Sequence, residues 1–184
     1  LVTTAKDLFY KFGVKRVSIE EICKKANVSK MTFYKHFSSK VDLFHFIMTR
    51  IYEQSFVKYD AIVQSDVSFM EKLQEMIRLK EQYTDYLSKE MLSELIDSPH
   101  LQIKELIESQ KAKNITGFMT VLKQAKEKHE LRPDIRPEFV LYMLNHLMEL
   151  SKDPQLLSLY DNAQDLALEI TNFMFYGLGP INEK

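Results

Sequence analysis

Cysteine, glycine and proline are scarce in this chain, and tryptophan is absent. The 184 residues include one cysteine, Cys23, with four glycines and five prolines. A single cysteine excludes an internal disulfide and suits a reducing compartment, so we expect a cytoplasmic protein. So few glycines and prolines argue against a sheet-rich fold with many tight turns. No apolar run approaches the ~18 residues that a membrane span requires, and we expect no secretory signal at the start.

Charge is distributed unevenly, although the net charge of the whole chain is −1. Residues 1–45 carry nine Lys and Arg against four Asp and Glu, a net charge of +5. Residues 46–184 carry sixteen against twenty-two, a net charge of −6. Between Ile22 and Val41 there are five lysines and no acid. The pattern indicates a basic head that meets a polyanion, unless the run is a chance feature of a solvated face.

Apolar residues recur at helical spacing almost everywhere, and period-two strand patterns are absent, so we predict an all-α fold. Ser98 and Pro99 are typical of an N-cap followed by proline at the first helical position. The two prolines of "ELRPDIRPE" must separate two helices. A further short segment begins at Asp153-Pro154. The expected helices cover residues 1–12, 18–26, 29–37, 40–63, 69–87, 88–97, 99–128, 137–151 and 162–176.

Capping residues mark the ends of the first helices. Gly13 is a natural C-cap, and Ser18 with Glu21 forms a capping box at the start of the second helix. Asn27 lies at a sharp turn, where its tolerance of positive φ is useful. A second capping box, at Ser39 and Asp42, should begin the long fourth helix.

The stretch "VSKMTFYKHFSSK", residues 28–40, holds three lysines, a histidine and three aromatic residues without an acid. It follows the second helix after a short turn and contains a helix capped by Ser29, which is a helix-turn-helix arrangement. Val28, Phe33 and Phe37 are spaced to pack against the first helix. Lysine can bond guanine or phosphate, threonine can contact thymine, and tyrosine can donate to phosphate. The residues expected to face away from the core are Lys30, Met31, Thr32, Tyr34 and Lys35.

The segment "AKDLFYKFGVKRVSIEEICKKANVSKMTFYKHFSSKVDLF" closely resembles the DNA-binding head of the TetR family of transcriptional regulators. The resemblance covers about residues 1–48. Asn27 stands where a turn glycine is common, and the basic arm usual before the first helix is not among residues 1–184. The resemblance implies phosphate contacts by Ser18, Tyr34, His36 and Lys40. It implies base contacts by Lys30, Met31, Thr32 and Lys35.

The resemblance also implies nine helices, a homodimer, double-stranded DNA as a partner and a C-terminal domain that binds a small ligand. We predict a DNA-binding domain at 1–45 and a ligand-binding and dimerisation domain at 46–184. We expect no cofactor, no metal site and no enzymatic activity. "KHELRP" lacks a second histidine at zinc-site spacing, Cys23 lacks a paired base, and there is no glycine-rich phosphate loop. Regularly spaced metal-ligating histidines are also lacking.

The apolar stripes of the last two long helices predict the dimer interface, because two such helices can meet their symmetry mates in a four-helix bundle. The alternative is that both stripes belong to the core of one chain. The interface residues we predict are Met143, Leu147, Leu150, Leu166, Ile170, Phe173 and Met174.

A ligand cavity is a further expectation. Apolar residues interrupted by a few polar ones suit an apolar or aromatic small molecule, although they also suit an ordinary core. The candidate residues are Tyr83, Tyr86, Gln110, Asn114, Phe118 and Met119.

Two functions follow from these observations. The first is a homodimeric repressor that a small ligand releases from a palindromic operator. The alternative is an architectural or adaptor DNA-binding protein of the same fold, whose acidic body recruits a protein instead of a small molecule.

Overall fold

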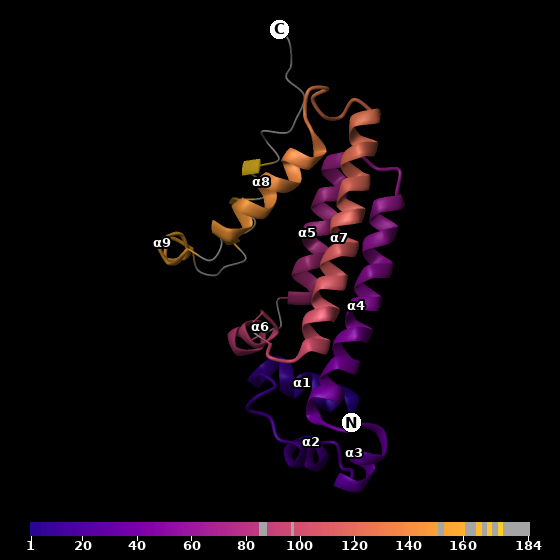
Figure 1. Ribbon diagram of the computed structural model, residues 1–184, viewed down its shortest axis with the longest axis vertical. Helices are drawn as coiled ribbons and strands as arrows, with labels where there is room; N and C mark the ends of the chain where they lie inside the picture. Colours follow the sequence, from indigo (N-terminus) through magenta and orange to yellow (C-terminus); the bar gives the residue numbers. More distant parts are fainter. Residues whose placement is uncertain are drawn as a thin grey trace. The chain divides into compact units, whose positions relative to one another are not determined.

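The computed structural model describes residues 1–84, 88–96, 98–150, 153–160, 165–166, 169–170 and 173–174. Every regular element in this part of the chain is a helix, which confirms the predicted all-α fold (Figure 1). Most of the predicted last helix, 162–176, lies outside the described residues. The elements are α1 (Val2–Phe12), α2 (Ile19–Lys25), α3 (Lys30–His36), α4 (Lys40–Gln64), α5 (Phe69–Thr84), α6 (Lys89–Ile96), α7 (Leu101–Glu127), α8 (Pro137–Leu150) and α9 (Pro154–Leu157).

The chain divides into two compact units. Unit 1 contains Leu1–Lys58 and Gln82–Ala112, and unit 2 contains Tyr59–Glu81 and Lys113–Lys184. The long helices α4, α5 and α7 therefore contribute residues to both units. The boundary that we predicted between residues 45 and 46 stays a prediction. Among the described residues, no helix combines the length and the apolarity that crossing a membrane requires.

The first caps form where the sequence predicts them. Ser18 Oγ accepts a hydrogen bond from Glu21 N at 3.1 Å, and Ser29 Oγ accepts one from Thr32 N at 3.0 Å. Asn27 has φ 54°, and Gly13, with φ 78°, follows the last residue of α1. These local signals fix the ends of α1, α2 and α3, because each satisfies backbone groups that a helix end leaves unpaired.

The fourth helix begins at Lys40 as predicted, with one difference in its capping box, whereas the predicted start of the seventh helix differs from the structure. Ser39 Oγ accepts from Asp42 N at 3.0 Å, but the Asp42 carboxylate accepts from Ser38 N at 2.8 Å and not from Ser39. The predicted start of α7 at Ser98-Pro99 is wrong, since the helix begins at Leu101. Ser98 Oγ accepts from His100 N at 3.4 Å, so it closes a local turn before the helix.

The core of unit 1 joins the first helices to α6 and to the start of α7. Phe9 and Phe33 are fully buried, and the rings of Phe9 and Phe44 meet edge to face with centroids 5.7 Å apart. Met91 of α6 and Ile103 of α7 are buried in the same cluster. The head helices therefore share one core with α6 and with the start of α7.

A carboxylate of α6 holds the loop that follows α1. Glu94 Oε2 accepts hydrogen bonds from Val14 N at 2.6 Å and from Lys15 N at 3.0 Å. A Cβ at Gly13 would lie 2.7 Å from Glu94 Oε1, so only glycine leaves room for this contact at its positive φ. Ser88 N also donates to Tyr10 O at 2.9 Å. Polar contacts thus reinforce the apolar packing of α1 on α6.

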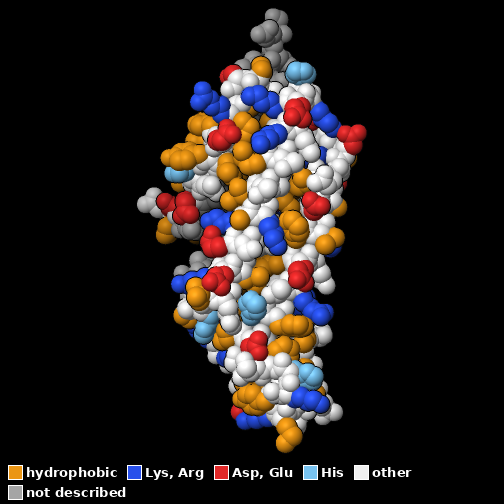
Figure 2. All heavy atoms as spheres, turned by 45° about the vertical axis from the view of Figure 1, so that its right-hand side comes forward, with side chains coloured by type: hydrophobic (Ala, Val, Ile, Leu, Met, Phe, Trp, Pro, Cys, Tyr) orange, Lys and Arg blue, Asp and Glu red, His pale blue; other side chains and the backbone are white. Residues whose placement is uncertain are grey.

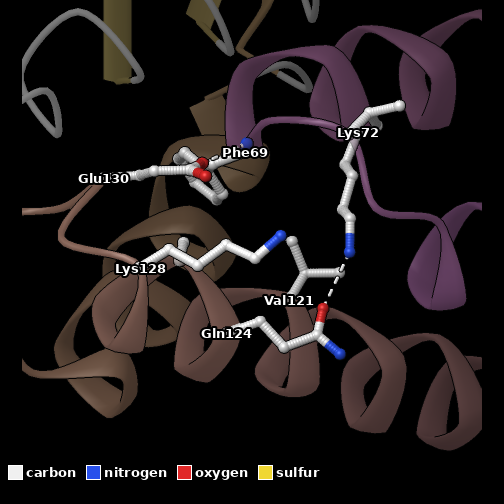
Figure 3. Close-up of a pocket in the computed structure, with 8 residues that line it drawn as sticks. Phe69, Lys72, Val121, Gln124, Lys128 and Glu130 are labelled. Carbon is white, nitrogen blue, oxygen red and sulfur yellow. Dashed lines mark hydrogen bonds between the residues drawn. The ribbon is translucent and has the colours of Figure 1, made fainter.

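The core of unit 2 contains residues of α4, α5, α7 and α8, among them Val63, Phe69, Leu122 and Val140. One lysine is buried beside it, with 4% of its surface exposed. The Lys72 ammonium donates to Val63 O at 2.8 Å and to Gln124 Oε1 at 2.7 Å (Figure 3). Burial lowers the pKa of Lys72. Because Val63 lies in the last turn of α4, the lysine caps a helix end that favours positive charge.

We predict that Glu94→Ala lowers the free energy of unfolding by about 1–3 kcal/mol, because the partly buried N–H of Val14 loses its acceptor. Urea unfolding followed by circular dichroism measures the change. Glu108→Ala, which removes an exposed acid from α7 of the same unit, is the control. Equal stability of the Glu94 and Glu108 variants would contradict the role of the carboxylate.

Candidate nucleic-acid interface

The turn between α2 and α3 determines where α3 lies. Asn27 takes positive φ, and Val28 N donates to Cys23 O at 3.0 Å, so the chain reverses within a few residues. Cys23 is buried and packs at this turn, as expected of a structural thiol. Phe33 is the buried residue of α3, and its ring contacts those of Tyr34 and Phe37, with centroids 5.3 and 6.0 Å apart. The second and third helices therefore form a helix-turn-helix.

With Phe33 turned inward, α3 presents its remaining side chains to solvent. Met31 is 84% exposed and Tyr34 is 56% exposed. Lys30, Thr32 and Lys35 are exposed as well. So are Ser18 and His36, the other candidates for phosphate contact apart from Lys40. Seven of the eight predicted DNA-contacting side chains are thus accessible to a ligand, and their contacts with DNA stay a prediction.

Lys40 differs from the other seven, because it is half-buried and its ammonium donates to backbone carbonyls of the protein. Its Nζ donates to Val17 O at 2.6 Å and to Lys15 O at 3.1 Å. Burial lowers the pKa of Lys40, and the nearby Glu94 opposes this effect. The side chain ties the start of α4 to the loop before α2, and therefore also fixes the place of Ser18. A phosphate contact by Lys40 would have to use its remaining N–H.

An ion pair at the tip of α3 was not foreseen from the sequence. Lys30 Nζ pairs with Glu20 Oε1 of α2, and both side chains are more than half exposed. The hydrogen bond from Lys30 lowers the pKa of Glu20, and the same bond raises the pKa of Lys30. The stretch 28–40 contains no acid of its own, but a carboxylate of α2 is bonded to its first lysine. Only the helix-turn-helix geometry brings residues ten positions apart together here.

The predicted ligand residues fall in both units. Tyr83 packs against the core of unit 1, and Phe118 is buried in the core of unit 2, with Met119 packed against it. Tyr86 lies outside the described residues. The remaining two, Gln110 and Asn114, are half-buried and exposed respectively, and the carbonyl of Asn114 accepts from Tyr59 Oη at 2.6 Å.

One hollow in unit 2 lies beside the buried Lys72, between α5 and α7 (Figure 3). Its cavity volume is about 10 Å³, which is room for about one water molecule. It is therefore too small for the apolar or aromatic ligand that we expect. Within the described part of the chain, no three His, Cys, Asp or Glu side chains come together as a metal site.

The predicted dimer residues separate into inward and outward groups. Leu166, Ile170 and Met174 are buried within the chain itself. Met143 and Leu147 are half-buried and pack against the core of unit 2. The last two, Leu150 and Phe173, are exposed.

Comparisons with known proteins agree with this geometry. Residues 1–47 match the model of the family described as bacterial regulatory proteins, tetR family. The Transposon Tn10 TetC protein of Escherichia coli is 33% identical over 87 residues, which are 47% of this chain and 42% of TetC. The aligned part therefore spans less than half of that relative.

Solved structures match nearly the whole chain. A transcriptional regulator from Cytophaga hutchinsonii has a TM-score of 0.74 at 16% identity, over 97% of this chain and 96% of that one. FadR from Bacillus subtilis, solved in complex with stearoyl-CoA, has a TM-score of 0.69 at 13% identity, over 96% and 97% of the two chains. At these identities the likeness establishes the fold.

The helix-turn-helix and the helices that follow it have the fold of solved proteins that are described as transcriptional regulators. The match to the tetR family model over residues 1–47 confirms the resemblance found in that segment of the sequence. The matched family is described as regulatory proteins, and the lack of enzymatic activity stays an expectation drawn from the sequence.

We predict that Lys40→Ala lowers the free energy of unfolding by about 1 kcal/mol, because the carbonyls of Lys15 and Val17 lose a charged donor that solvent partly screens. Thermal and urea unfolding measure the loss. Lys35→Ala removes the same charge from an exposed position and should change stability by less than about 0.5 kcal/mol. If the two variants are equally stable, Lys40 does not hold the loop.

Proposed function

We propose that this protein is a homodimeric transcriptional repressor that binds a palindromic DNA operator and leaves it when a small ligand binds. The outward surface of α3 carries the proposal. That surface combines exposed lysines, a threonine and a tyrosine on a stretch without acids, and a helix of this kind enters the major groove by its N-terminal residues. The family match over residues 1–47 supports the same role.

The proposed contacts divide into two groups. Ser18, Tyr34 and His36 would bind phosphate oxygens, which set the position of the protein on the duplex. Lys40 would join them through its free N–H and the start of α4, where helix N–H groups favour an anion. Specificity would come from base edges, which Lys can bond at guanine and Thr can contact at thymine. The base-reading residues we propose are Lys30, Met31, Thr32 and Lys35.

The proposed dimer uses the solvent-exposed face of α8. Phe139, Tyr142 and Leu150 are exposed and recur at spacings of three and eight, with His146 stacked on Tyr142 at 4.1 Å between ring centroids. Hydrophobic side chains gather at the upper left of the face drawn in Figure 2. Phe173 adds a further exposed ring. Exposed apolar stripes of this kind mark interfaces, and a twofold pair would place the α3 helices one DNA turn or more apart, ~34–36 Å.

A small apolar or aromatic molecule is the ligand we propose. FadR, which has a similar fold, was solved with stearoyl-CoA, whose acyl chain is apolar. A ligand can release the protein from DNA only if it binds the DNA-competent state less tightly than the other state. Tyr83, Phe118 and Met119 are candidates to contact it, together with Tyr86, Gln110 and Asn114.

Selection of duplexes from a random pool should yield one short, near-palindromic site, and compounds can then be screened for release of that site. Tyr34→Phe should weaken binding to all sequences several-fold, because one phosphate bond is lost. Lys35→Ala should cost about 1–3 kcal/mol and relax the preference at one base pair. Lys111→Ala, which removes an exposed lysine from α7, is the control. Uniform coating of DNA without a preferred site would favour an architectural protein.

Replacement of Tyr142 by Glu should dissociate the dimer, because each twofold pair would bury two carboxylates in an apolar interface. Sedimentation equilibrium measures the mass, and circular dichroism checks that the helices persist. Val57→Glu places the same charge at an exposed apolar residue of α4 and should leave the dimer intact. A Tyr142→Glu variant that stays dimeric would mean that the interface lies elsewhere.

A further inference from the structure

The tip of α3 carries one acid that belongs to another helix. Lys30 is the first residue of α3, and its ammonium is bonded to the Glu20 carboxylate in the first turn of α2. Glu20 lies two residues after Ser18, the predicted phosphate contact. The carboxylate is therefore bonded to one side chain that we assign to DNA and lies two residues from another, where an acid would repel phosphate.

We propose that Glu20 positions Lys30 for a base edge and makes the protein more selective for its operator, an inference that rests on the function proposed above. A lysine ammonium has three donors, of which Glu20 takes one. Two remain, and guanine presents two acceptors, O6 and N7, in the major groove. A lysine held at the helix tip meets these acceptors with less loss of side-chain freedom than an unrestrained one.

The same contact reduces binding to DNA of any other sequence. Sequence-independent affinity comes from cations that neutralise phosphates and release counterions. While Lys30 is paired with Glu20, its charge is offset by a carboxylate and contributes little to this attraction. Loss of Glu20 would free Lys30 to reach any phosphate, so random DNA would gain more than the operator does.

The test compares wild-type protein with Glu20→Gln on the selected operator and on a pool of random duplexes, across a series of salt concentrations. We expect Glu20→Gln to bind random DNA about three- to tenfold more tightly, with a salt slope steeper by about 0.9 for the added phosphate contact. The operator should gain less than random DNA does, so the ratio of the two affinities falls. Thermal unfolding checks that the variant is folded.

Glu21→Gln is the matched control, because Glu21 is an exposed acid in the same turn of α2 and is not the partner of Lys30. It removes the same charge from the surface, so it corrects for general electrostatics. Lys30→Gln completes a double-mutant cycle. If Glu20 acts through Lys30, Glu20→Gln has the same small effect as Glu21→Gln once Lys30 is also replaced.

The results of this experiment distinguish the role of Glu20 from the proposed DNA-binding function. Equal effects of Glu20→Gln and Glu21→Gln, an unchanged ratio, or an effect that persists without Lys30 would overturn the inference and leave DNA binding intact. A wild-type protein that binds no DNA would overturn both. If the wild type binds DNA without a preferred site, the repressor proposal fails. The inference fails as well if, on random duplexes, Glu20→Gln changes the salt slope equally with and without Lys30.

Discussion

Burial of Phe33 is the contact on which the outward surface of α3 depends. The helix has only seven residues, so one anchored side chain sets its rotation about its own axis. At 3.6 residues per turn, Met31 and Lys35 fall almost opposite to Phe33. The ring is held by an apolar core that also contains Phe9 of α1 and Ile22 of α2. Packing chemistry thus determines which polar residues are presented to a partner.

Side chains from other helices bond both the N–H and the C=O groups of the loop between α1 and α2. Glu94 of α6 accepts from the N–H groups of Val14 and Lys15, and Lys40 of α4 donates to the carbonyls of Lys15 and Val17. An acid and an amine from two different helices therefore hold one short segment. Because that segment leads into the Ser18 cap, the start of α2 is fixed by contacts that are remote in the sequence.

Local features could be predicted and remote ones could not. The caps at Ser18 and Ser29 depend on residues three positions apart, which a sequence displays directly. The start of α7 was misplaced because Ser98 bonds His100 instead of capping a helix, and both uses suit the same residue. Glu94 lies about eighty positions from its partners, and no periodicity links them.

The outward face of the last helices illustrates a second limit. Apolar spacing predicted stripes, but it did not distinguish the side that packs inward from the side left exposed. Leu166 and Ile170 are buried, whereas Phe139 and Tyr142 of α8 are exposed. Large aromatic residues suit both a core and an interface, so only the packed chain separates them. The Glu20–Lys30 pair was hidden for a related reason, since it depends on the angle between two helices.

The contact between Glu94 and the loop after α1 shows that the DNA-binding head depends on residues outside it. Residues 1–47 match the family model by themselves, so they are an obvious segment to fuse to another protein. Yet part of what holds them, including Met91, Ile103 and the Glu94 carboxylate, is encoded more than forty residues downstream. A fusion of this segment to another protein would therefore be stable only if that protein supplied an acid and apolar side chains in equivalent positions.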